Sequence, residues 1–309
     1  MSFSARISLL NGLCAVALAL PAPVALAWNA AGHRLSAIIA WEHMSLAART
    51  ETSRLLRQHA AVSQWERKLN AAPLALENTP LRLSAEAELF AEAATWADDI
   101  KRSVPYPSPR LVGNDSLGKD WHYLDWPLGA ARQAAKEGQL DRQIKRLSIL
   151  LADNTQSDAD RSEALTWLLH LIADAHQPLH AAAQINNGRS DAGGNGFKIS
   201  DPENPRLPES NLHRFWDDLP GPPWLRGERL LALAKTLQTR HADLPLPTGE
   251  VDTWLEESHA LATEKVYPDS PQPFEITKAY RSMARQVANE RLLQAGKRMG
   301  LWLNKLLAR

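Results

Sequence analysis

Apolar side chains recur at helical spacing along most of this chain, and this periodicity is the feature that most constrains its fold. Leu165, Leu168, Leu169 and Ile172 follow the i, i+3, i+4, i+7 pattern that places side chains on one face of a helix. Alternation of apolar and polar residues, which is typical of a half-buried strand, is scarce. We therefore predict an all-α fold. The helices are expected at residues 32–46, 47–60, 85–103, 130–152, 159–180, 228–240, 249–264 and 275–307.

Two stretches interrupt the helical pattern, at residues 104–120 and 181–211, and both contain several glycines and prolines. Loops of this length inside a compact domain are usually functional. The sequence shows no repeat and no shift in composition that would mark a second domain. We therefore expect one helical domain with long loops around a functional cleft.

The N-terminus has the order of a cleavable secretory signal. One positive charge at Arg6 precedes a mostly apolar run from Ile7 to Leu20, and the small-residue tripeptide Ala25-Leu26-Ala27 follows. The apolar run is shorter than the roughly 20 residues that span a membrane. We predict a signal peptide at residues 1–27, cleavage between Ala27 and Trp28, and a periplasmic or secreted mature domain at residues 28–309 without a membrane anchor.

The composition of the predicted mature chain limits its chemistry. Cys14 is the only cysteine and leaves with the signal, so no disulfide and no thiolate metal ligand remains. Arg6 also leaves, which changes the formal net charge from 0 to about −1. Because no overall positive field would attract nucleic acid, local contacts or a metal would have to hold a phosphate. We expect a monomer.

Histidine and aspartate gather in three clusters. His170 and Asp174 are four residues apart, and so are His213 and Asp217, which places each pair on one face of a helix. His180 follows Pro178, which should end or kink the helix and turn His180 toward the same cavity. The third cluster runs from Asp120 to Asp125 around His122, and Asp98 precedes it.

A single His/Asp pair is more often a satisfied surface or core pair than a metal site. Here two such pairs lie among apolar and tryptophan residues, where unpaired charge is costly unless a metal or hydrogen bonds compensate it. Imidazole and carboxylate are the ligands that zinc accepts when thiolate is absent. Together the clusters supply more ligands than one zinc ion uses, so the sequence predicts a site with several metal ions.

These residues, in this order, resemble the S1/P1 nucleases, which are trinuclear zinc enzymes that cleave single-stranded nucleic acid and remove 3′-phosphates from nucleotides. The resemblance spans nearly the whole predicted mature chain and implies the helical zinc phosphodiesterase fold that phospholipase C and P1 nuclease share. The matching ligand-type positions are Trp28, His33, Asp98, His122, His170, Asp174, His180, His213 and Asp217.

The resemblance implies three zinc ions per chain. Asp98, His122, His170 and Asp174 would hold the first, and His180, His213 and Asp217 the second. Trp28 would hold the third through its α-amine and its own carbonyl oxygen, together with His33 and a shared Asp174. An α-amine has a pKa near 8 and deprotonates readily beside a dication. Because an amide to Ala27 would block that nitrogen, signal cleavage would also activate the enzyme.

The resemblance also assigns residues to catalysis and to substrate binding. Asp98, Lys101 and Asp174 would lie at the catalytic centre, with Lys101 adding positive charge near the phosphoryl group. Tyr123 would stack on a base, and Asp125 would accept hydrogen bonds from base-edge N–H groups. Asn195 lies in a glycine-rich turn that this family places near the metals. We expect the neighbouring Trp121 and Trp126 to pack in the core, and His176 to bond the scaffold instead of a metal.

Two other functions remain open at this point. A zinc phospholipase C would use the same scaffold, but its last ligand is usually Glu where this chain has Asp217, and it would have no use for a base pocket. A non-catalytic zinc-binding protein is the other alternative. Surplus histidine in low-complexity tracts would favour that function, whereas here the ligand-type residues are dispersed singly. The sequence therefore favours a nuclease that acts on single-stranded DNA, RNA and 3′-nucleotides.

Overall fold

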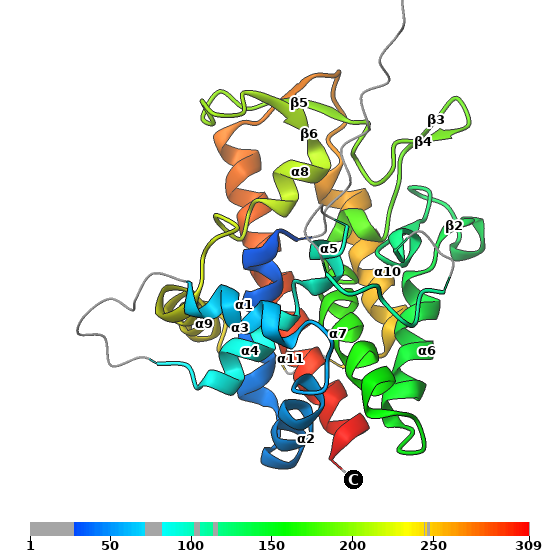
Figure 1. Cartoon of the computed structure of the whole chain (residues 1–309). Coiled ribbons are helices and arrows are strands. Elements are labelled where there is room, and N and C mark those ends of the chain that lie inside the picture. Colours follow the sequence, from blue (N-terminus) through cyan, green and yellow to red (C-terminus); the bar gives the residue numbers. More distant parts are fainter. Residues whose placement is uncertain are drawn as a thin grey trace, which may run out of the picture.

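The structure, a computed structural model, describes residues 28–71, 82–101, 106–113, 117–243, 245 and 248–308. It confirms the all-α class, because helices form the body and the strands are two or three residues long (Figure 1). The predicted signal segment, residues 1–27, lies outside these residues. The α-helices are α1 Ala30–His43, α2 Leu46–Leu56, α3 Val62–Asn70, α4 Ala85–Ala93, α5 Trp96–Asp99, α6 Leu140–Ala152, α7 Asp158–Asp174, α8 Leu212–Asp217, α9 Gly227–Arg240, α10 Val251–Leu261 and α11 Lys278–Leu307.

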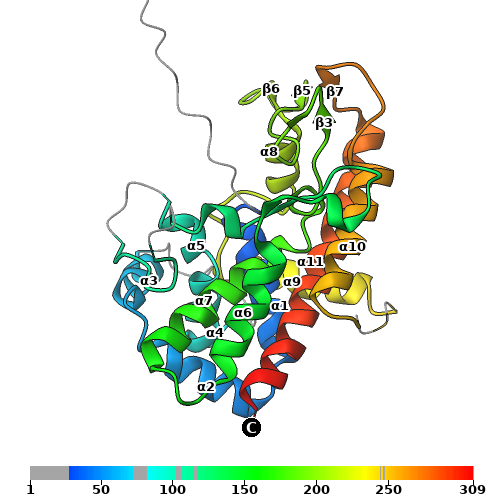
Figure 2. The same ribbon diagram turned by 90° about the vertical axis from the view of Figure 1, so that its right-hand side faces the viewer.

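Three long helices form the centre of the molecule. Helix α1 packs along α11, and both contact α7 (Figure 2). Two glycines of α11 allow the close approach, since a Cβ at Gly296 would lie 2.5 Å from Cβ of Ile39 and one at Gly300 would lie 2.6 Å from the carbonyl oxygen of Ala40. Helix α7 is buried from Arg161 to Asp174. A helix buried on every side belongs to the core, so its polar residues must find partners inside the protein.

Several predicted helix boundaries are wrong, and long-range contacts explain two of them. The helix expected from residue 130 begins only at Leu140, because β1 (Leu124–Asp125) pairs with β2 (Glu137–Gly138). Gly138 has a φ of +89°, and a Cβ there would lie 2.1 Å from the Tyr123 carbonyl oxygen. The helix expected at residues 85–103 is divided into α4 and α5. The sequence did not predict α3, and it gave no bounds for α8, although the spacing of His213 and Asp217 indicated a helix there.

The helix expected at residues 159–180 ends at Asp174, and the chain re-enters a short 3₁₀ turn, η3, at Pro178–His180. Gln177 caps this turn by accepting a hydrogen bond from the Leu179 N–H. The remaining short turns are the 3₁₀ helices η1 Lys119–Trp121 and η2 Arg132–Ala134 and the π-helical turn η4 Ala262–Val266.

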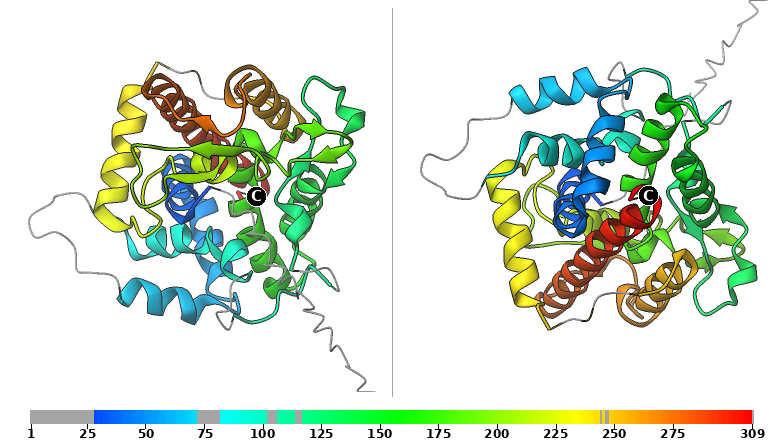
Figure 3. Two further views of the ribbon diagram at one scale, coloured as in Figure 1. Left: turned by 90° about the horizontal axis from the view of Figure 1, so that it is seen from above. Right: turned by 90° about the horizontal axis from the view of Figure 1, so that it is seen from below.

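The long loop predicted at residues 181–211 contains four short strands, β3 to β6. Strands β3 (Ile185–Asn186) and β4 (Arg189–Ser190) form a hairpin. Strand β5 (Lys198–Ser200) pairs antiparallel with β6 (Glu209–Asn211) and parallel with β7 (Phe274–Glu275). The left view of Figure 3 shows this small sheet lying across one end of the helical body. Among the described residues, no helix is both long enough and apolar enough to cross a membrane.

Candidate metal centre

The structure brings the predicted ligand side chains together from six parts of the chain. His33 comes from α1, Asp98 from α5, and His170 and Asp174 from the last turns of α7. His122 follows η1, His180 ends η3, and His213 and Asp217 lie on α8. All eight side chains are buried. Their ligand atoms form three groups within 4.8 Å, which are His33–His170–Asp174, Asp98–His122–His170 and His180–His213–Asp217.

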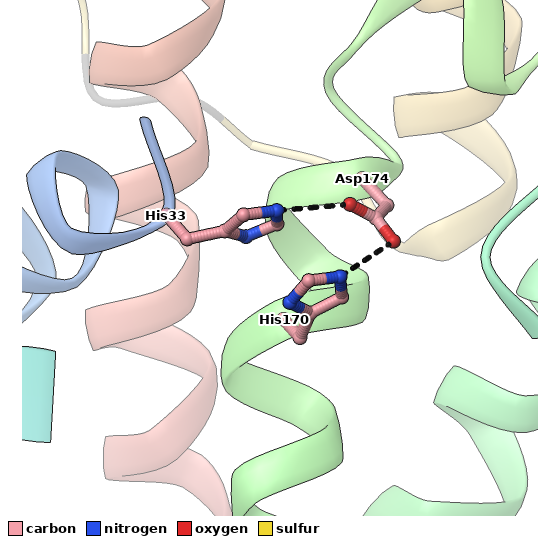
Figure 4. Close-up of side chains that lie close together, drawn as sticks. All are labelled: His33, His170 and Asp174. Carbon is pink, nitrogen blue, oxygen red and sulfur yellow. Dashed lines mark ion pairs between the residues drawn. The ribbon is translucent and has the colours of Figure 1, made fainter. Parts of the chain in front are cut away.

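Asp174 is the shared centre of this assembly. Its Oδ1 lies 3.5 Å from Nε2 of His33, and its Oδ2 lies 3.4 Å from Nε2 of His170. Figure 4 shows both imidazoles facing this one carboxylate from α1 and α7. Nδ1 of His122 lies 3.0 Å from Oδ2 of the same carboxylate, and Oδ1 of Asp98 lies 3.7 Å from Nε2 of His170. Asp174 can therefore bridge two metal ions.

The third group lies next to the first two. Nε2 of His213 is 3.4 Å from Oδ2 of Asp217, and the His180 and His213 rings lie with their centroids 4.9 Å apart. Nδ1 of His180 is 4.0 Å from Oδ2 of Asp174, which links this group to the shared carboxylate. The predicted second ligand set, His180, His213 and Asp217, coincides with this group.

Backbone carbonyls fix the orientation of three of the imidazoles. Nδ1 of His170 donates to the Ala94 carbonyl at 2.9 Å, and Nδ1 of His180 donates to the His122 carbonyl at 2.6 Å. Nδ1 of His213 donates to the Gly193 carbonyl at 2.6 Å. Each ring therefore presents Nε2 to the centre. A hydrogen bond from the other ring nitrogen to a carbonyl is usual for a histidine that binds a metal. The break between α4 and α5 lies at the carbonyl that His170 uses.

The chemistry of these donors fits a metal ion. Nε2 of His33, His122 and His180 and Oδ1 of Asp174 are buried and make no hydrogen bond among the described residues. Burial lowers the pKa of these imidazoles well below the ordinary value, so they are neutral donors. Burial raises the pKa of Asp174 and Asp217 well above the ordinary value. Ionising a buried carboxylate is costly unless a positive charge lies beside it, and a dication supplies that charge.

Lys101 is the one cation of this site that the sequence singled out. Its Nζ donates to Oδ1 of Asp98 at 2.9 Å, and the side chain is 3% exposed. Burial is the largest cause that lowers the pKa of His122 and of His170, and the positive charge of Lys101 is the second. The pKa of His170 falls to about 3. Lys101 therefore lies inside the candidate centre and contacts a predicted ligand.

Trp28 and the residue after it contact α7 and α8, the helices that carry Asp174 and Asp217. Its indole Nε1 donates to the Ala173 carbonyl at 3.1 Å, and the backbone N–H of Asn29 donates to the Asp217 carbonyl at 3.1 Å. Gly32 makes room for this arrangement, since a Cβ there would lie 2.8 Å from Cβ of Trp28. The backbone of Trp28 is therefore placed beside the first and third groups. Its role as a ligand stays a prediction.

The predicted substrate-binding residues lie on the loops around the centre. Tyr123 is partly buried, and burial raises the pKa of its phenol. Asp125 accepts a hydrogen bond from Ser190 Oγ at 2.6 Å, and burial raises its pKa to about 6. The side-chain amide of Asn195 donates to the Ala192 carbonyl at 2.8 Å, so it bonds within its own turn. No contact among the described residues tests the roles predicted for these three.

The two neighbouring tryptophans pack in the core, as the sequence predicted. Trp121 is 3% exposed and its ring lies 4.7 Å from that of Trp167. Trp126 is stacked on His259 with the centroids 4.0 Å apart, and the guanidinium of Arg132 lies 5.2 Å from the centroid of the Trp126 ring. These contacts bury Trp121 and Trp126, whereas Tyr123 between them is only partly buried.

His176 is bonded to the scaffold, as predicted. Its Nδ1 donates to the Ile172 carbonyl at 2.7 Å, and its Nε2 accepts from Arg298 at 3.0 Å. Sequence reasoning missed Gln177, the residue that follows. Gln177 is fully buried, and its Nε2 donates to Oδ1 of Asp217 at 2.9 Å. Its position directly before Pro178 gave no sign that it would reach α8.

Comparisons with known proteins identify the family of this chain. The S1/P1 nuclease family model matches residues 28–308. Nuclease S1 of Aspergillus oryzae is 22% identical over 70% of this chain and 78% of its own. Endonuclease 2 of Arabidopsis thaliana is 25% identical over 72% and 79%, and nuclease P1 of Penicillium citrinum is 23% identical over 72% and 86%. Because the family model spans every helix of the described structure, this chain belongs to the S1/P1 nuclease family.

Proposed function

We propose that this chain is a zinc-dependent phosphodiesterase and phosphomonoesterase. It cleaves single-stranded DNA and RNA to products with 5′-phosphate ends, and it removes the 3′-phosphate from nucleotides. The observation that carries the proposal is the convergence of three buried His/Asp groups around Asp174 in a chain of a nuclease family. Nitrogen and oxygen donors without thiolate fit catalytic zinc.

The proposed assignment uses three zinc ions. Asp98, His122, His170 and Asp174 hold one, and Trp28, His33 and Asp174 hold another. The third set comprises His180, His213 and Asp217. The contacts of Asp174 with imidazoles on both of its oxygens support its double use. When bound, zinc supplies positive charge for the phosphoryl oxygens and lowers the pKa of a water molecule toward neutrality.

The residues of the chain prepare this site before substrate arrives. The carbonyls of Ala94, His122 and Gly193 hold three imidazoles in one orientation, so little reorganisation is needed during the reaction. Lys101 adds a fixed positive charge beside Asp98, which favours the negative charge that develops on the phosphoryl group. Hydrolysis forms a bond between the oxygen of water and phosphorus, breaks the bond between phosphorus and the 3′ oxygen, and leaves a proton on that oxygen. A diester then yields a 5′-phosphate end, and a 3′-nucleotide yields free phosphate.

Tyr123 and Asp125 account for the preference for single strands. An aromatic ring stacks on any base face, and a carboxylate accepts hydrogen bonds from base-edge N–H groups. A duplex hides both the faces and the edges. Tyr123 is only partly buried, and Asp125 lies two residues further along the chain, at the end of β1.

We further propose that the mature enzyme is periplasmic or secreted and begins at Trp28. The signal pattern of the sequence supports this proposal, and a free α-amine at Trp28 would complete the metal position proposed for Trp28, His33 and Asp174. The family match also begins at residue 28. N-terminal sequencing of the purified protein would test it, and an N-terminus upstream of Trp28 in the active enzyme would contradict it.

One set of assays tests the activity. Zinc-loaded protein is incubated with denatured DNA, with 3′-AMP and with a phosphatidylcholine emulsion. We expect turnover of the first two. Turnover of lipid alone would instead indicate a phospholipase C, and no turnover of any substrate by correctly processed, zinc-loaded protein would indicate a non-catalytic zinc protein.

A further inference from the structure

Ser190 contacts the carboxylate that is proposed to read the base. Its Oγ donates to Oδ2 of Asp125 at 2.6 Å and accepts the N–H of Ala192 at 2.9 Å. A serine hydroxyl has one proton to donate. The Ala192 N–H binds a lone pair of the Ser190 oxygen, so the one hydroxyl proton is donated to Asp125. The short distance is typical of a hydrogen bond to an ionised group.

The loop that carries Ser190 is anchored independently of Asp125. Oδ1 of Asp191 accepts the N–H of Gln184 at 3.0 Å and the hydroxyl of Tyr267 at 3.1 Å. The carbonyl of Asp191 accepts the N–H of Gly196 at 2.8 Å. These bonds close the base of the β3–β4 hairpin, which extends from the helical body in Figure 1. Ser190 therefore approaches Asp125 from a fixed support.

This contact lies at the edge of the metal centre. Asp125 is three residues after His122, and the chain that follows His180 runs beside it. The N–H of Ala183 donates to the Trp126 carbonyl at 2.9 Å, and the N–H of Leu128 donates to the Ala183 carbonyl at 3.1 Å. Two segments that carry predicted ligands are thus joined next to Asp125. A nucleotide bound at the metals would have its base within this region.

One oxygen of Asp125 is left for a ligand. Within the part of the chain that the structure describes, Oδ1 accepts no hydrogen bond, whereas Oδ2 is held by Ser190. We propose that Ser190 is a specificity-determining positioning residue: it holds Oδ2 so that Oδ1 is presented to the N–H groups of a nucleobase. This inference rests on the proposed function and adds a residue to it that no sequence pattern indicated.

The test separates base recognition from hydrolysis. Steady-state rates are measured on 3′-AMP and on ribose 3-phosphate, which lacks the base. Ser190→Ala should raise KM for 3′-AMP by about 5- to 10-fold, the size expected for the net contribution of one ordinary hydrogen bond, with kcat nearly unchanged. The constants for ribose 3-phosphate should not change. Ser190→Thr keeps the hydroxyl and should restore most of the affinity.

A matched control removes a different hydrogen bond from the same loop. Tyr267→Phe loses the bond to Asp191 but not the bond to Asp125, so it should leave the ratio of KM values for the two substrates unchanged. An equal loss on both substrates in Ser190→Ala, or the same selective loss in Tyr267→Phe, would show that the hydroxyl only supports the hairpin. Either result overturns the inference, and so does an unchanged KM for 3′-AMP in Ser190→Ala.

A binding measurement keeps this test distinct from the test of the proposed function. Calorimetry with AMP should give a Kd that is about 5- to 10-fold higher for Ser190→Ala than for wild type. If zinc-loaded wild-type protein hydrolyses neither substrate, the proposed function fails and the inference is judged on AMP binding alone. Unchanged binding in the variant, or no binding of AMP to wild type, then overturns it.

Discussion

Gln177 connects two predicted ligands of the metal centre and gives the sharpest prediction. Its side chain is fully buried, donates to Oδ1 of Asp217 at 2.9 Å and accepts the N–H of Leu179 at 2.7 Å. It therefore orients the Asp217 carboxylate and also fixes the 3₁₀ turn that ends at His180. Gln177→Met keeps the size and shape of the side chain and removes both hydrogen bonds.

The expected magnitude follows from these two contacts. A hydrogen bond to a charged group contributes about 1.5–3 kcal/mol. Outer contacts of metal ligands typically change metal affinity by about 10- to 100-fold, which corresponds to about 1.4–2.8 kcal/mol. We expect Gln177→Met to bind its weakest zinc ion about 10- to 100-fold less tightly. The unpaired, buried N–H of Leu179 should lower the free energy of unfolding by a further 1–3 kcal/mol or so.

The assay is a competition titration of zinc against a chelating indicator, with zinc per chain measured by metal analysis at several fixed free zinc concentrations. Ser258→Ala serves as the control, because Ser258 Oγ donates to the Ala175 carbonyl at 2.7 Å and so supports the same turn without contacting a carboxylate. The control should lose stability but keep wild-type zinc affinity. Wild-type affinity in Gln177→Met, or an equal loss in both variants, would refute the reasoning.

Three further predictions concern the N-terminus, a buried ion pair and salt. One extra residue before Trp28 in a correctly folded protein should remove one zinc per chain, because the amide blocks the Trp28 nitrogen. Full zinc content in that variant would contradict the role of the α-amine. Burial alone would raise the pKa of Glu92, but the ion pairs with Arg34 and Arg226 lower that pKa from 4.5 to about 2. The ionised Glu92 therefore contributes roughly 3 kcal/mol to the free energy of unfolding above pH 4.5, and this contribution is lost as the pH falls through 2. Urea unfolding should therefore show a deficit in Glu92→Gln at pH 7 that shrinks below pH 4.5, and a deficit independent of pH would contradict the ion-pair origin. Binding to denatured DNA should weaken with salt by a slope that corresponds to fewer than about six phosphate contacts, because the net charge of the mature chain is near zero.

Local spacing determined the parts of the site that lie within one helix. His170 and Asp174, and likewise His213 and Asp217, are four residues apart, so any helix places each pair on one face. Pro178 indicated that the helical run breaks before His180, although α7 ends earlier, at Asp174. The absence of cysteine from the predicted mature chain restricted the metal ligands to nitrogen and oxygen. Helix class, ligand types and family could therefore be recognised from the order of residues.

The tertiary structure decided how these pieces combine. The predicted helix at residues 85–103 is broken where the Ala94 carbonyl receives His170, and the helix predicted from residue 130 starts late because Gly138 pairs with β1. Neither partner is near in sequence. The contacts of Gln177 with Asp217 and of Ser190 with Asp125 join residues 40 and 65 positions apart.

The physical reason is that a sequence pattern reports periodicity and local sterics, whereas these contacts depend on which backbone carbonyls and side chains the packing of α1, α7 and α11 brings together. A buried glutamine or serine has no periodic signature, and its role becomes visible only when its partner is known. By itself, the sequence determined which groups this protein can offer to a metal. The packing of the helices decided that Asp174 lies between imidazoles from several elements, and that backbone carbonyls hold two of those imidazoles.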